Sequence, residues 1–139
     1  MTHLNFLKEI ESKTVSDARG VLEYIELPEE NSFQSKRIYY ISDVPPDSVR
    51  GAHAHKNLRQ FFFALSGSFL LTVTDGIKTD KVRVLANSNG YFLPSGYWRE
   101  LSEFEPNTIC LVLASEHFEE SDYIRDISSY LEWKNLNGN

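Results

Sequence analysis

Cysteine is nearly missing from this chain of 139 residues, which has only Cys110. A single cysteine excludes an internal disulfide, so the fold depends on its own core, and a chain of this length buries enough surface to form one. Cys110 lies in the apolar run TICLVLA, which predicts a buried strand. We therefore expect Cys110 to be a small core residue and not a nucleophile.

Long apolar runs and targeting signals are missing as well. No apolar stretch approaches the roughly 20 residues that a membrane-spanning helix needs. The N-terminal segment MTHLNFLKEIESK has no basic lead, no long apolar stretch and no small-residue cleavage site, so a secretory signal is not predicted. We expect a soluble, cytoplasmic protein with no membrane partner.

The chain also lacks an excess of positive charge, because 14 Lys and Arg stand against 20 Asp and Glu, which gives a formal net charge of −6. Nucleic-acid binding needs many cations that neutralise phosphates together, so no nucleic-acid partner is expected. A small phosphorylated ligand needs only one or two well-placed arginines. The candidates are Arg19, Arg37, Arg50, Arg59 and Arg99.

The chain does contain a regular succession of short strand-like runs. From Val21 onward, runs rich in Tyr, Phe, Val, Ile and Leu alternate with turn signals such as PEENS, DVPPDS, TDG and PSG. This spacing predicts an all-β fold, and the number of runs favours a jelly-roll barrel. No linker or repeat interrupts the sequence, so residues 1–139 are expected to form one domain.

The two ends of the chain depart from this pattern. After EES, Ile124, Ile127 and Leu131 recur at helical spacing, with Ser121 as the expected N-cap and Asp122 favourably placed beside the helix N-terminus. We therefore expect a short C-terminal helix packed on the barrel. Near the N-terminus, LNFLKEIE fits an edge strand or a helical turn, and the strand is favoured.

Two histidines one residue apart stand out in the stretch RGAHAHKNLRQ. On a strand, residues two apart point to the same face, so His53 and His55 share one environment. A pair of surface histidines on an edge strand is the plainer alternative. An inward-facing pair suits proton transfer, because an imidazole titrates near pH 6.5 and acts as acid or base at neutral pH.

These histidines belong to a longer pattern. H-x-H followed by Gln60 and Gly67 resembles the first motif of the cupin superfamily, and GYFLPSGYWRE resembles the second, with Arg99 at its histidine position. A cupin metal site normally takes three histidines and one glutamate, and here Gln60 and Arg99 replace two of these four ligands. Arg99 also brings positive charge to the place of the ion. We therefore expect no bound metal.

Several strings resemble one metal-independent cupin family, the WxcM-like sugar nucleotide 3,4-ketoisomerases that act on dTDP-4-keto-6-deoxyglucose. They are KRIYYI, RGAHAHKNLRQ, LSGS, PSGYWRE and LASEHFEESDYIRD, and the resemblance extends from about Ala18 to Ile127. It implies a cupin-type jelly-roll barrel and a homodimer whose subunits exchange N-terminal strands. The family reaction moves a carbonyl from C4 to C3 of the hexose through an enediol, so no cofactor is expected.

The resemblance also implies catalytic roles. His53 matches the base that acts at carbon, and His55 matches its partner, which moves the oxygen-bound proton. Tyr39 matches a tyrosine near the reacting carbons, whose phenol can donate to a developing oxyanion, and a structural role is the alternative. Tyr40 points the other way along the strand and is expected in the core.

Five further residues are assigned to substrate binding. Arg37 and Arg50 are expected at the diphosphate, because arginine offers planar paired donors, and solvated surface arginines are the alternative. Gln60 either donates a hydrogen bond in the pocket or satisfies a buried polar neighbour. Arg19 and Arg99 match positions at which family members of opposite product C4 configuration differ. Some members have tyrosine at the Arg19 position and others histidine at the Arg99 position, so the product configuration stays open.

Three other functions are alternatives. A nucleotide-sugar 3,5-epimerase removes protons beside the same ketone without metal, but it usually depends on a His–Asp pair facing a tyrosine, and no aspartate close in sequence to H-x-H suggests that pair. A non-catalytic sugar-nucleotide-binding cupin module would have no turnover to lose in His53→Asn, whereas an isomerase would keep binding and stop turning over. A metal-dependent cupin oxygenase is the weakest alternative, because of Gln60 and Arg99.

Overall fold

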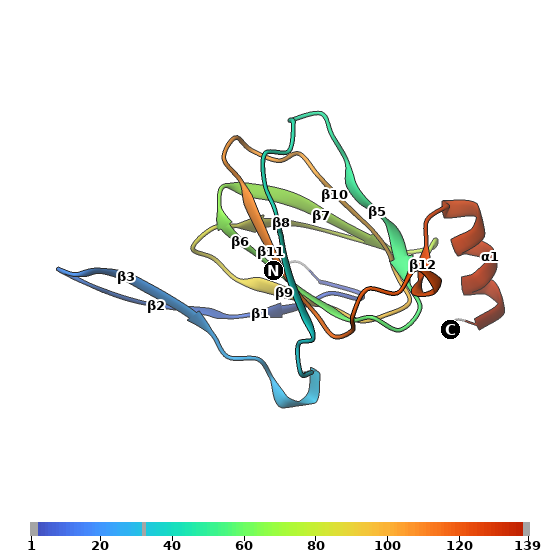
Figure 1. Cartoon of the computed structure of the whole chain (residues 1–139), viewed down its shortest axis with the longest axis horizontal. Coiled ribbons are helices and arrows are strands. Elements are labelled where there is room, and N and C mark those ends of the chain that lie inside the picture. The colour runs from blue at the N-terminus through green and yellow to red at the C-terminus, as the bar shows by residue number, and fades with distance from the viewer. Residues whose placement is uncertain (1–2, 32, 138–139) are drawn as a thin grey trace.

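The computed structural model describes residues 3–31 and 33–137, which form mainly antiparallel β-strands (Figure 1). One sheet has the order β1-β9-β6-β11-β4, and a second has the order β12-β5-β10-β7-β8. In the first sheet the strands are β1 Lys8–Ile10, β4 Arg37–Ile41, β6 Gln60–Ser66, β9 Gly90–Leu93 and β11 Ile109–Ala114. In the second they are β5 Arg50–His55, β7 Ser68–Thr74, β8 Thr79–Leu85, β10 Trp98–Ser102 and β12 Tyr123–Ile124.

This is the expected all-β, cupin-type jelly roll with a C-terminal helix. Within the described residues the ladder hydrogen bonds stay inside each sheet, so the two sheets are not closed into one continuous barrel. The strand-like runs from Val21 onward contain the strands β3 to β11, and β1 confirms the strand favoured for LNFLKEIE. The turn expected at PEENS contains a short 3-10 helix, η1 Glu29–Asn31, and its Ser32 lies outside the described residues.

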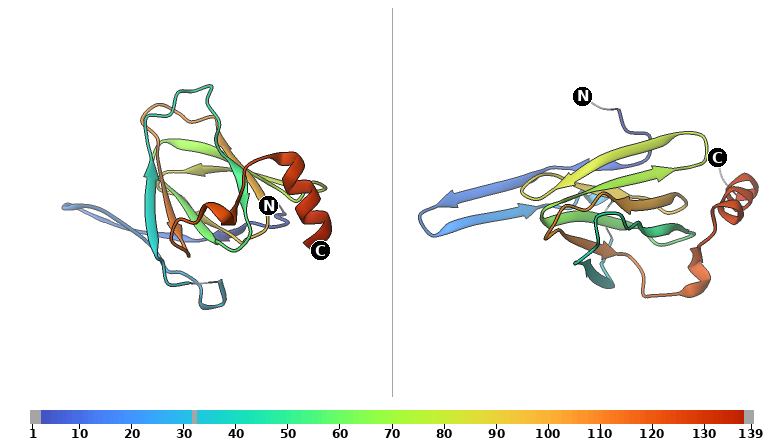
Figure 2. Two further views of the ribbon diagram at one scale, coloured as in Figure 1. Left: turned by 45° about the vertical axis from the view of Figure 1, so that its right-hand side comes forward. Right: turned by 90° about the horizontal axis from the view of Figure 1, so that it is seen from above.

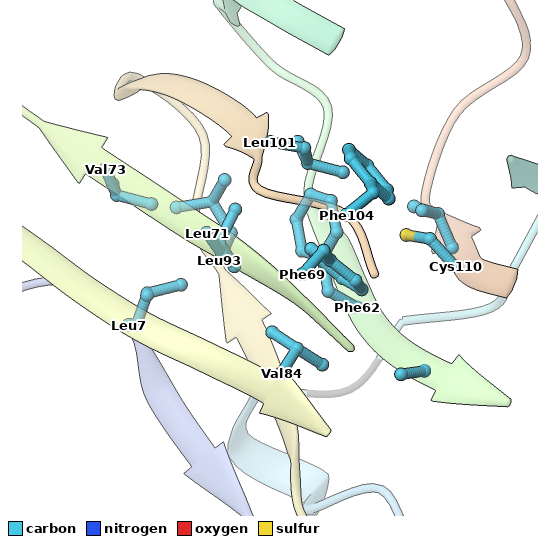
Figure 3. Packing of buried hydrophobic residues seen from close by; sticks show 12 residues of the cluster. Leu7, Phe62, Phe69, Leu71, Val73, Val84, Leu93, Leu101, Phe104 and Cys110 are labelled. Atoms are coloured by element: carbon cyan, nitrogen blue, oxygen red, sulfur yellow. The ribbon is translucent and has the colours of Figure 1, made fainter. Parts of the chain in front are cut away.

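The main core lies between the two sheets, and Figure 3 shows the side chains that fill it. Successive side chains of a strand point to opposite faces, so every second one enters the core. In β11, Cys110, Val112 and Ala114 are fully buried and their neighbours are half-buried. Phe69 is fully buried and stacks on Phe104 with ring centroids 5.4 Å apart. Burial raises the pKa of the Cys110 thiol to about 12, which agrees with the core role expected for it.

A hairpin projects from this body. Its strands, β2 Ser12–Asp17 and β3 Gly20–Ile25, pair only with each other among the described residues. In Figures 1 and 2 the hairpin reaches away from the two sheets on the side opposite the C-terminal helix. It carries exposed apolar side chains, of which Val21 is 64% and Leu22 58% exposed. An apolar ribbon of this kind is typical of a surface that another molecule covers.

The C-terminal segment folds differently from its prediction. Residues Glu120–Asp122 form a short 3-10 helix, η2, the strand β12 follows, and helix α1 begins only at Ile127 and ends at Asn137. The expected N-cap at Ser121 is therefore wrong. Asp126 caps α1 instead, because its Oδ2 accepts the backbone N–H of Ser129 at 2.9 Å.

Helix α1 is anchored to the second sheet by one aromatic residue. Tyr130 is fully buried and packs in a cluster with Ala54, Trp98 and Ile124, and its hydroxyl donates to the carbonyl of Gly96 at 2.9 Å. The rest of the helix is largely exposed. In the described part of the chain, no helix combines the length and apolar character required to span a membrane.

Tyr40 contradicts its expected place in the core, because it is 71% exposed. The alternation along β4 was predicted correctly, since Tyr39 faces the interior and Tyr40 faces outward. The outer face of this strand is open, however, and Ile38 beside it is also 63% exposed. β4 is an edge strand of the first sheet, so in this chain nothing described lies beyond it.

Candidate active site

A cavity of about 490 Å³ is lined by residues of β4, β5, β10 and β12. This volume lies within the range of about 300–1,000 Å³ that is usual for small-molecule sites. Its functional lining consists of four arginines (Arg37, Arg50, Arg99 and Arg125), two tyrosines (Tyr39 and Tyr123) and His53. None of the described residues that line it is an aspartate or glutamate. The cavity is therefore strongly positive in a chain whose net charge is −6.

The two histidines of β5 lie on one face of the strand, as the alternation predicts. Their Nε2 atoms are 3.1 Å apart, and their rings meet edge to face with centroids 4.8 Å apart. His53 lines the cavity, whereas His55 is 4% exposed and lies behind it. Tyr123 of β12 packs against both rings, with centroid distances of 4.8 and 4.4 Å. The pair is an internal one, and the surface alternative is excluded for His55.

Asp122 lies within hydrogen-bonding distance of His55, so a His–Asp pair is present although no aspartate close in sequence to H-x-H suggested one. Its Oδ2 is 3.1 Å from Nδ1 of His55, across 67 positions of sequence. The contact forms because β12 pairs with β5, with Tyr123 opposite His55. Nearness in sequence does not indicate this contact, because strand pairing brings distant residues together.

Arg99 occupies the centre of a second network. The residue is 2% exposed, and β10 pairs with β5 so that Arg99 lies opposite His53. Its Nη1 donates to the carbonyl of Gly51 at 2.7 Å and its Nε donates to Oε1 of Gln60 at 3.1 Å. Gln60 is 1% exposed and does not line the cavity, so it satisfies buried polar neighbours. Together these contacts hold a guanidinium at the cavity wall.

Tyr39 is held with its hydroxyl proton free. The amide of Gln60 donates to its Oη at 2.8 Å, and Nη2 of Arg99 approaches the same oxygen at 3.5 Å. Both neighbours are donors, so the phenol accepts from them and keeps its own O–H for another acceptor. Burial raises the pKa of Tyr39, although the charge of Arg99 acts against this, so the phenol stays protonated. A protonated phenol with a free O–H is suited to stabilising an oxyanion.

Burial also sets the state of the histidines. It lowers the pKa of His53 to about 2 and that of His55 to about 3, and the positive charge of Arg99 acts in the same direction on both. Both imidazoles are neutral at neutral pH, which is the state that accepts a proton. Burial lowers the pKa of Arg99 too, but a guanidinium stays charged.

The other cavity arginines differ in how far they are already paired. Nε and Nη2 of Arg37 are buried and have no hydrogen-bond partner among the described residues, and the guanidinium lies 5.5 Å from the ring of Tyr39. Arg125 stacks on Tyr123 at 4.1 Å and is paired with Glu120 at 2.8 Å. Arg50 is exposed at the cavity wall. Arg37 is therefore the cavity arginine with buried donors that no described residue satisfies.

Arg19 is not brought to this cavity. It lies in the turn between β2 and β3, its side chain is 91% exposed, and it is paired with Asp17 at 2.7 Å. The hairpin that carries it points away from the sheets (Figure 2). In one chain, therefore, seven of the eight residues assigned to the site gather together and Arg19 does not.

Three residues of the site were not found as site residues in the sequence: Asp122, Tyr123 and Arg125. In the sequence, the string SDYIR indicates only the family resemblance and the start of a helix. Its period of two was the signal that could have found them, because Tyr123 and Arg125 alternate with Ile124 as strand residues do. A two-residue strand is too short for that signal to stand out.

A divalent metal does not fit this set of side chains. The two imidazoles contact each other through their Nε2 atoms, and the nearby third and fourth positions of the cupin pattern hold a neutral amide and a buried cation. Within the described residues, no three His, Cys, Asp or Glu side chains are grouped so that they could hold an ion. A guanidinium close to the histidines repels a divalent ion.

A family model and a known relative both assign the chain to the same family. The family described as "FdtA: WxcM-like, C-terminal" matches residues 5–135. The chain is 33% identical over 126 residues to the TDP-4-oxo-6-deoxy-α-D-glucose-3,4-oxoisomerase of Aneurinibacillus thermoaerophilus, with 91% of each chain covered.

Solved structures agree with this match. A mutant of the 3,4-ketoisomerase QdtA from Thermoanaerobacterium thermosaccharolyticum, in complex with TDP-4-keto-6-deoxyglucose, superposes with a TM-score of 0.87 at 32% identity and covers 97% of this chain and 98% of its own. The WlaRB TDP-quinovose 3,4-ketoisomerase of Campylobacter jejuni gives 0.82 at 36% identity, with 91% and 97% covered. ChmJ, a 3'-monoepimerase from Streptomyces bikiniensis, is only 16% identical and shares the fold alone. The chain belongs to the WxcM-like FdtA family of sugar nucleotide 3,4-ketoisomerases, the family that its strings KRIYYI and SDYIR resemble.

Proposed function

We propose that this protein converts dTDP-4-keto-6-deoxyglucose into a dTDP-3-keto-6-deoxyhexose. One observation carries the proposal: a neutral histidine pair, a phenol with a free O–H and four arginines meet at one cavity that has no described carboxylate in its lining. The histidines suit proton transfer, the phenol suits an oxyanion, and the arginines suit a diphosphate. The relatives named for this reaction support the same assignment.

The reaction starts at C3, whose hydrogen is made acidic by the C4 ketone. We assign the removal of this proton to His53, because it is the histidine that lines the cavity and its imidazole is neutral. The electrons form a C3–C4 double bond, and O4 becomes an enediolate oxygen. C4 then takes up a proton, and the proton of the C3 hydroxyl is transferred to O4, so that C3 becomes the ketone and O4 becomes a hydroxyl. No electron leaves the sugar, so the reaction needs no redox cofactor.

The enediolate needs donors that are already in place. Tyr39 and Arg99 supply them, because the phenol has a free O–H and the guanidinium is fixed by Gly51 and Gln60. Donors held in place before the reaction lose little energy in reorienting toward the new charge. His55 contacts His53 directly, so we assign to it the transfer of the oxygen-bound proton.

For the diphosphate we propose Arg37, Arg50 and Arg125. The argument is strongest for Arg37, because two buried nitrogens that no described residue satisfies are costly unless a ligand pairs with them. Arg50 was expected at the diphosphate and borders the same cavity. Arg125 is already paired with Glu120, so its share of the attraction is smaller.

We further propose that two copies form a dimer in which each β2–β3 hairpin covers its partner. The hairpin has exposed apolar residues and pairs with no sheet in the described part of its own chain, and Ile38 and Tyr40 on the edge strand β4 are exposed as well. This arrangement would bring Arg19 to the partner's cavity, which accounts for its distance from the cavity of its own chain.

A complementation experiment tests this role of Arg19. An Arg19→Ala chain is paired with a His53→Asn chain in one mixed dimer. If the hairpin serves the partner, one cavity of the mixed dimer has both native residues and activity returns to about half. If Arg19 serves its own chain, both cavities are defective and the mixed dimer stays as inactive as its parents. If Arg19 serves no cavity, the Arg19→Ala parent keeps wild-type activity on its own.

The pairing of His55 with Asp122 gives one specific argument for a second candidate, the nucleotide-sugar 3,5-epimerase. That chemistry also uses a His–Asp pair beside tyrosine. The buried Arg99 and the His53–His55 contact favour the isomerase, because moving a carbonyl needs a second group that handles oxygen-bound protons. The cytoplasmic location expected from the sequence stays a prediction.

Proton NMR in deuterated water separates the candidates. Metal-stripped protein is mixed with dTDP-4-keto-6-deoxyglucose, and the isomerase predicts a 3-keto sugar that carries deuterium at C4. Exchange at C5 with the 4-ketone retained would indicate the epimerase, and an unchanged sugar that still binds would indicate a binding module. Activity that returns only after addition of a divalent metal would contradict the metal-free site. The coupling at C4 of the product identifies its configuration.

A further inference from the structure

Asp122 lies behind the cavity and connects η2 to the end of β5. Its Oδ1 accepts the backbone N–H of Asn57 at 2.7 Å, and its Oδ2 accepts that of Leu58 at 3.3 Å and lies 3.1 Å from Nδ1 of His55. An ionised carboxylate has no proton to donate, so His55 must be the donor in the last contact. We propose that Asp122 is a positioning residue, which holds His55 in the tautomer that carries its proton on Nδ1.

This constraint decides which nitrogen of His55 is available. A neutral imidazole has one N–H and one bare nitrogen, so a proton on Nδ1 leaves Nε2 bare. That bare Nε2 lies 3.1 Å from Nε2 of His53. Two ring nitrogens at this distance need a proton between them, and only His53 can supply it. His53 is therefore the opposite tautomer, with its proton on Nε2.

The catalytic part of this inference rests on the proposed function. When His53 gains a proton on its bare nitrogen, it can pass its Nε2 proton to Nε2 of His55. The imidazolium that forms lies against the Asp122 carboxylate, which stabilises it. The protons move back along the same contacts as product forms, so the pair ends each turnover unchanged. With the other tautomer of His55, an N–H occupies Nε2 and the transfer is blocked.

The tautomers can be measured without substrate. Two-bond ¹⁵N–¹H NMR on histidine-labelled protein at about pH 7.5 distinguishes protonated from bare ring nitrogens, and the pair is neutral there. The other two histidines, His3 and His117, are exposed and can be assigned by substitution. We expect the proton of His55 on Nδ1 and that of His53 on Nε2. A wild-type His55 protonated on Nε2 overturns the proposal, whatever any variant does.

The variant Asp122→Asn gives a sharper test, because it should reverse both tautomers. Asn57 makes the shorter of the two backbone contacts, at 2.7 Å against 3.3 Å for Leu58, so the amide oxygen stays at the Oδ1 position. The NH₂ group then faces Nδ1 of His55, and the contact with Leu58 is lost. Nδ1 must then be bare, its proton moves to Nε2, and the proton of His53 moves to Nδ1. With the substrate, kcat should fall about 10²–10⁴-fold, the usual contribution of proton-transfer catalysis, while KM stays unchanged because Asp122 does not line the cavity.

Ser115→Ala is the matched control. Ser115 is buried, and its Oγ accepts the backbone N–H of Arg59 at 2.8 Å, so the control removes a side-chain acceptor beside the same 56–59 loop without touching a histidine. We expect it to keep the wild-type tautomers and kcat.

The outcomes separate two kinds of failure. Unchanged tautomers in Asp122→Asn, or reversed tautomers with wild-type kcat, overturn the positioning role. A wild type that has the expected tautomers but forms no 3-keto sugar overturns the proposed function and the catalytic role of Asp122 with it, and leaves only the tautomer assignment.

Discussion

Gly51 is the residue whose replacement should separate the function of Arg99 from the stability of the fold. Its φ is +67°, in the left-handed region that side chains with a Cβ adopt at a cost. Its carbonyl accepts Nη1 of Arg99 at 2.7 Å, and a Cβ built on Gly51 would overlap that same Nη1. Gly51→Ala must therefore strain the backbone and displace the guanidinium together.

The expected loss of stability is the sum of two effects. An alanine in the left-handed region costs roughly 1–2 kcal/mol. The lost hydrogen bond from a charged donor to the half-buried carbonyl costs about 1.5–3 kcal/mol. The free energy of unfolding should therefore fall by about 2.5–5 kcal/mol, which is less than the total stability of most domains, so the variant should still fold.

Urea unfolding at a fixed protein concentration measures this loss, and the isomerase assay measures the effect on Arg99. Gly76→Ala is the control, because its φ is +96° but the added Cβ meets only the flexible end of Leu131, far from the cavity. The control should lose stability from backbone strain and keep its kcat, whereas Gly51→Ala should lose both. If Gly51→Ala kept the wild-type kcat, the placement of Arg99 at the reacting sugar would be refuted.

Three further predictions concern acid stability, the diphosphate and the core. The folded pKa values of about 2 for His53 and about 3 for His55 lie below the ordinary 6.5, so the unfolded chain takes up protons that the folded chain does not. Stability is therefore fully present above pH 6.5 and falls toward pH 3, by up to about 1.4 kcal/mol per pH unit for the buried His55 and less for His53, which solvent screens. Urea unfolding at two pH values should show this slope, a double His→Asn variant should flatten it, and a flat wild type would contradict the buried, neutral pair. Arg37→Leu should raise KM about 10–100-fold, which is the equivalent of one charge-assisted hydrogen bond. The variant should lose no stability, because two nitrogens of Arg37 have no partner among the described residues. Arg59→Leu, outside the cavity, should leave KM unchanged, and equal effects of the two variants on KM would argue against a diphosphate at Arg37. Phe69→Ala should lower the free energy of unfolding by about 3–5 kcal/mol, because the ring is fully buried, and a loss below 1 kcal/mol would contradict the packing of the core.

The strands and much of the site were predictable from local patterns. Alternation placed His53 and His55 on one face, and the resemblance to the two cupin motifs placed Gln60 and Arg99 near them. These inferences succeeded because a strand's period of two fixes which residues share a face, whatever the rest of the fold does. The same rule predicted that Tyr39 and Tyr40 point to opposite faces of β4.

The errors arose where distant segments meet. Asp122 reaches His55 only because β12 pairs with β5, and its local sequence resembled the start of a helix. The same short strand moved the helix N-cap from Ser121 to Asp126. Tyr40 was expected in the core, but β4 is an edge strand and its outer face is open in one chain. Periodicity shows which residues share a face, but it does not show what covers that face.

The central claim is that the histidine pair performs chemistry and does not merely hold the sugar. Its most direct test is calorimetric binding of dTDP-4-keto-6-deoxyglucose to the separate His53→Asn and His55→Asn variants, combined with proton NMR of each mixture in deuterated water. We predict that both variants bind the sugar nearly as tightly as wild type, form no 3-keto product and, for His53→Asn, exchange no deuterium at C3. A His53→Asn variant that still forms the 3-keto sugar at the wild-type rate would contradict the account.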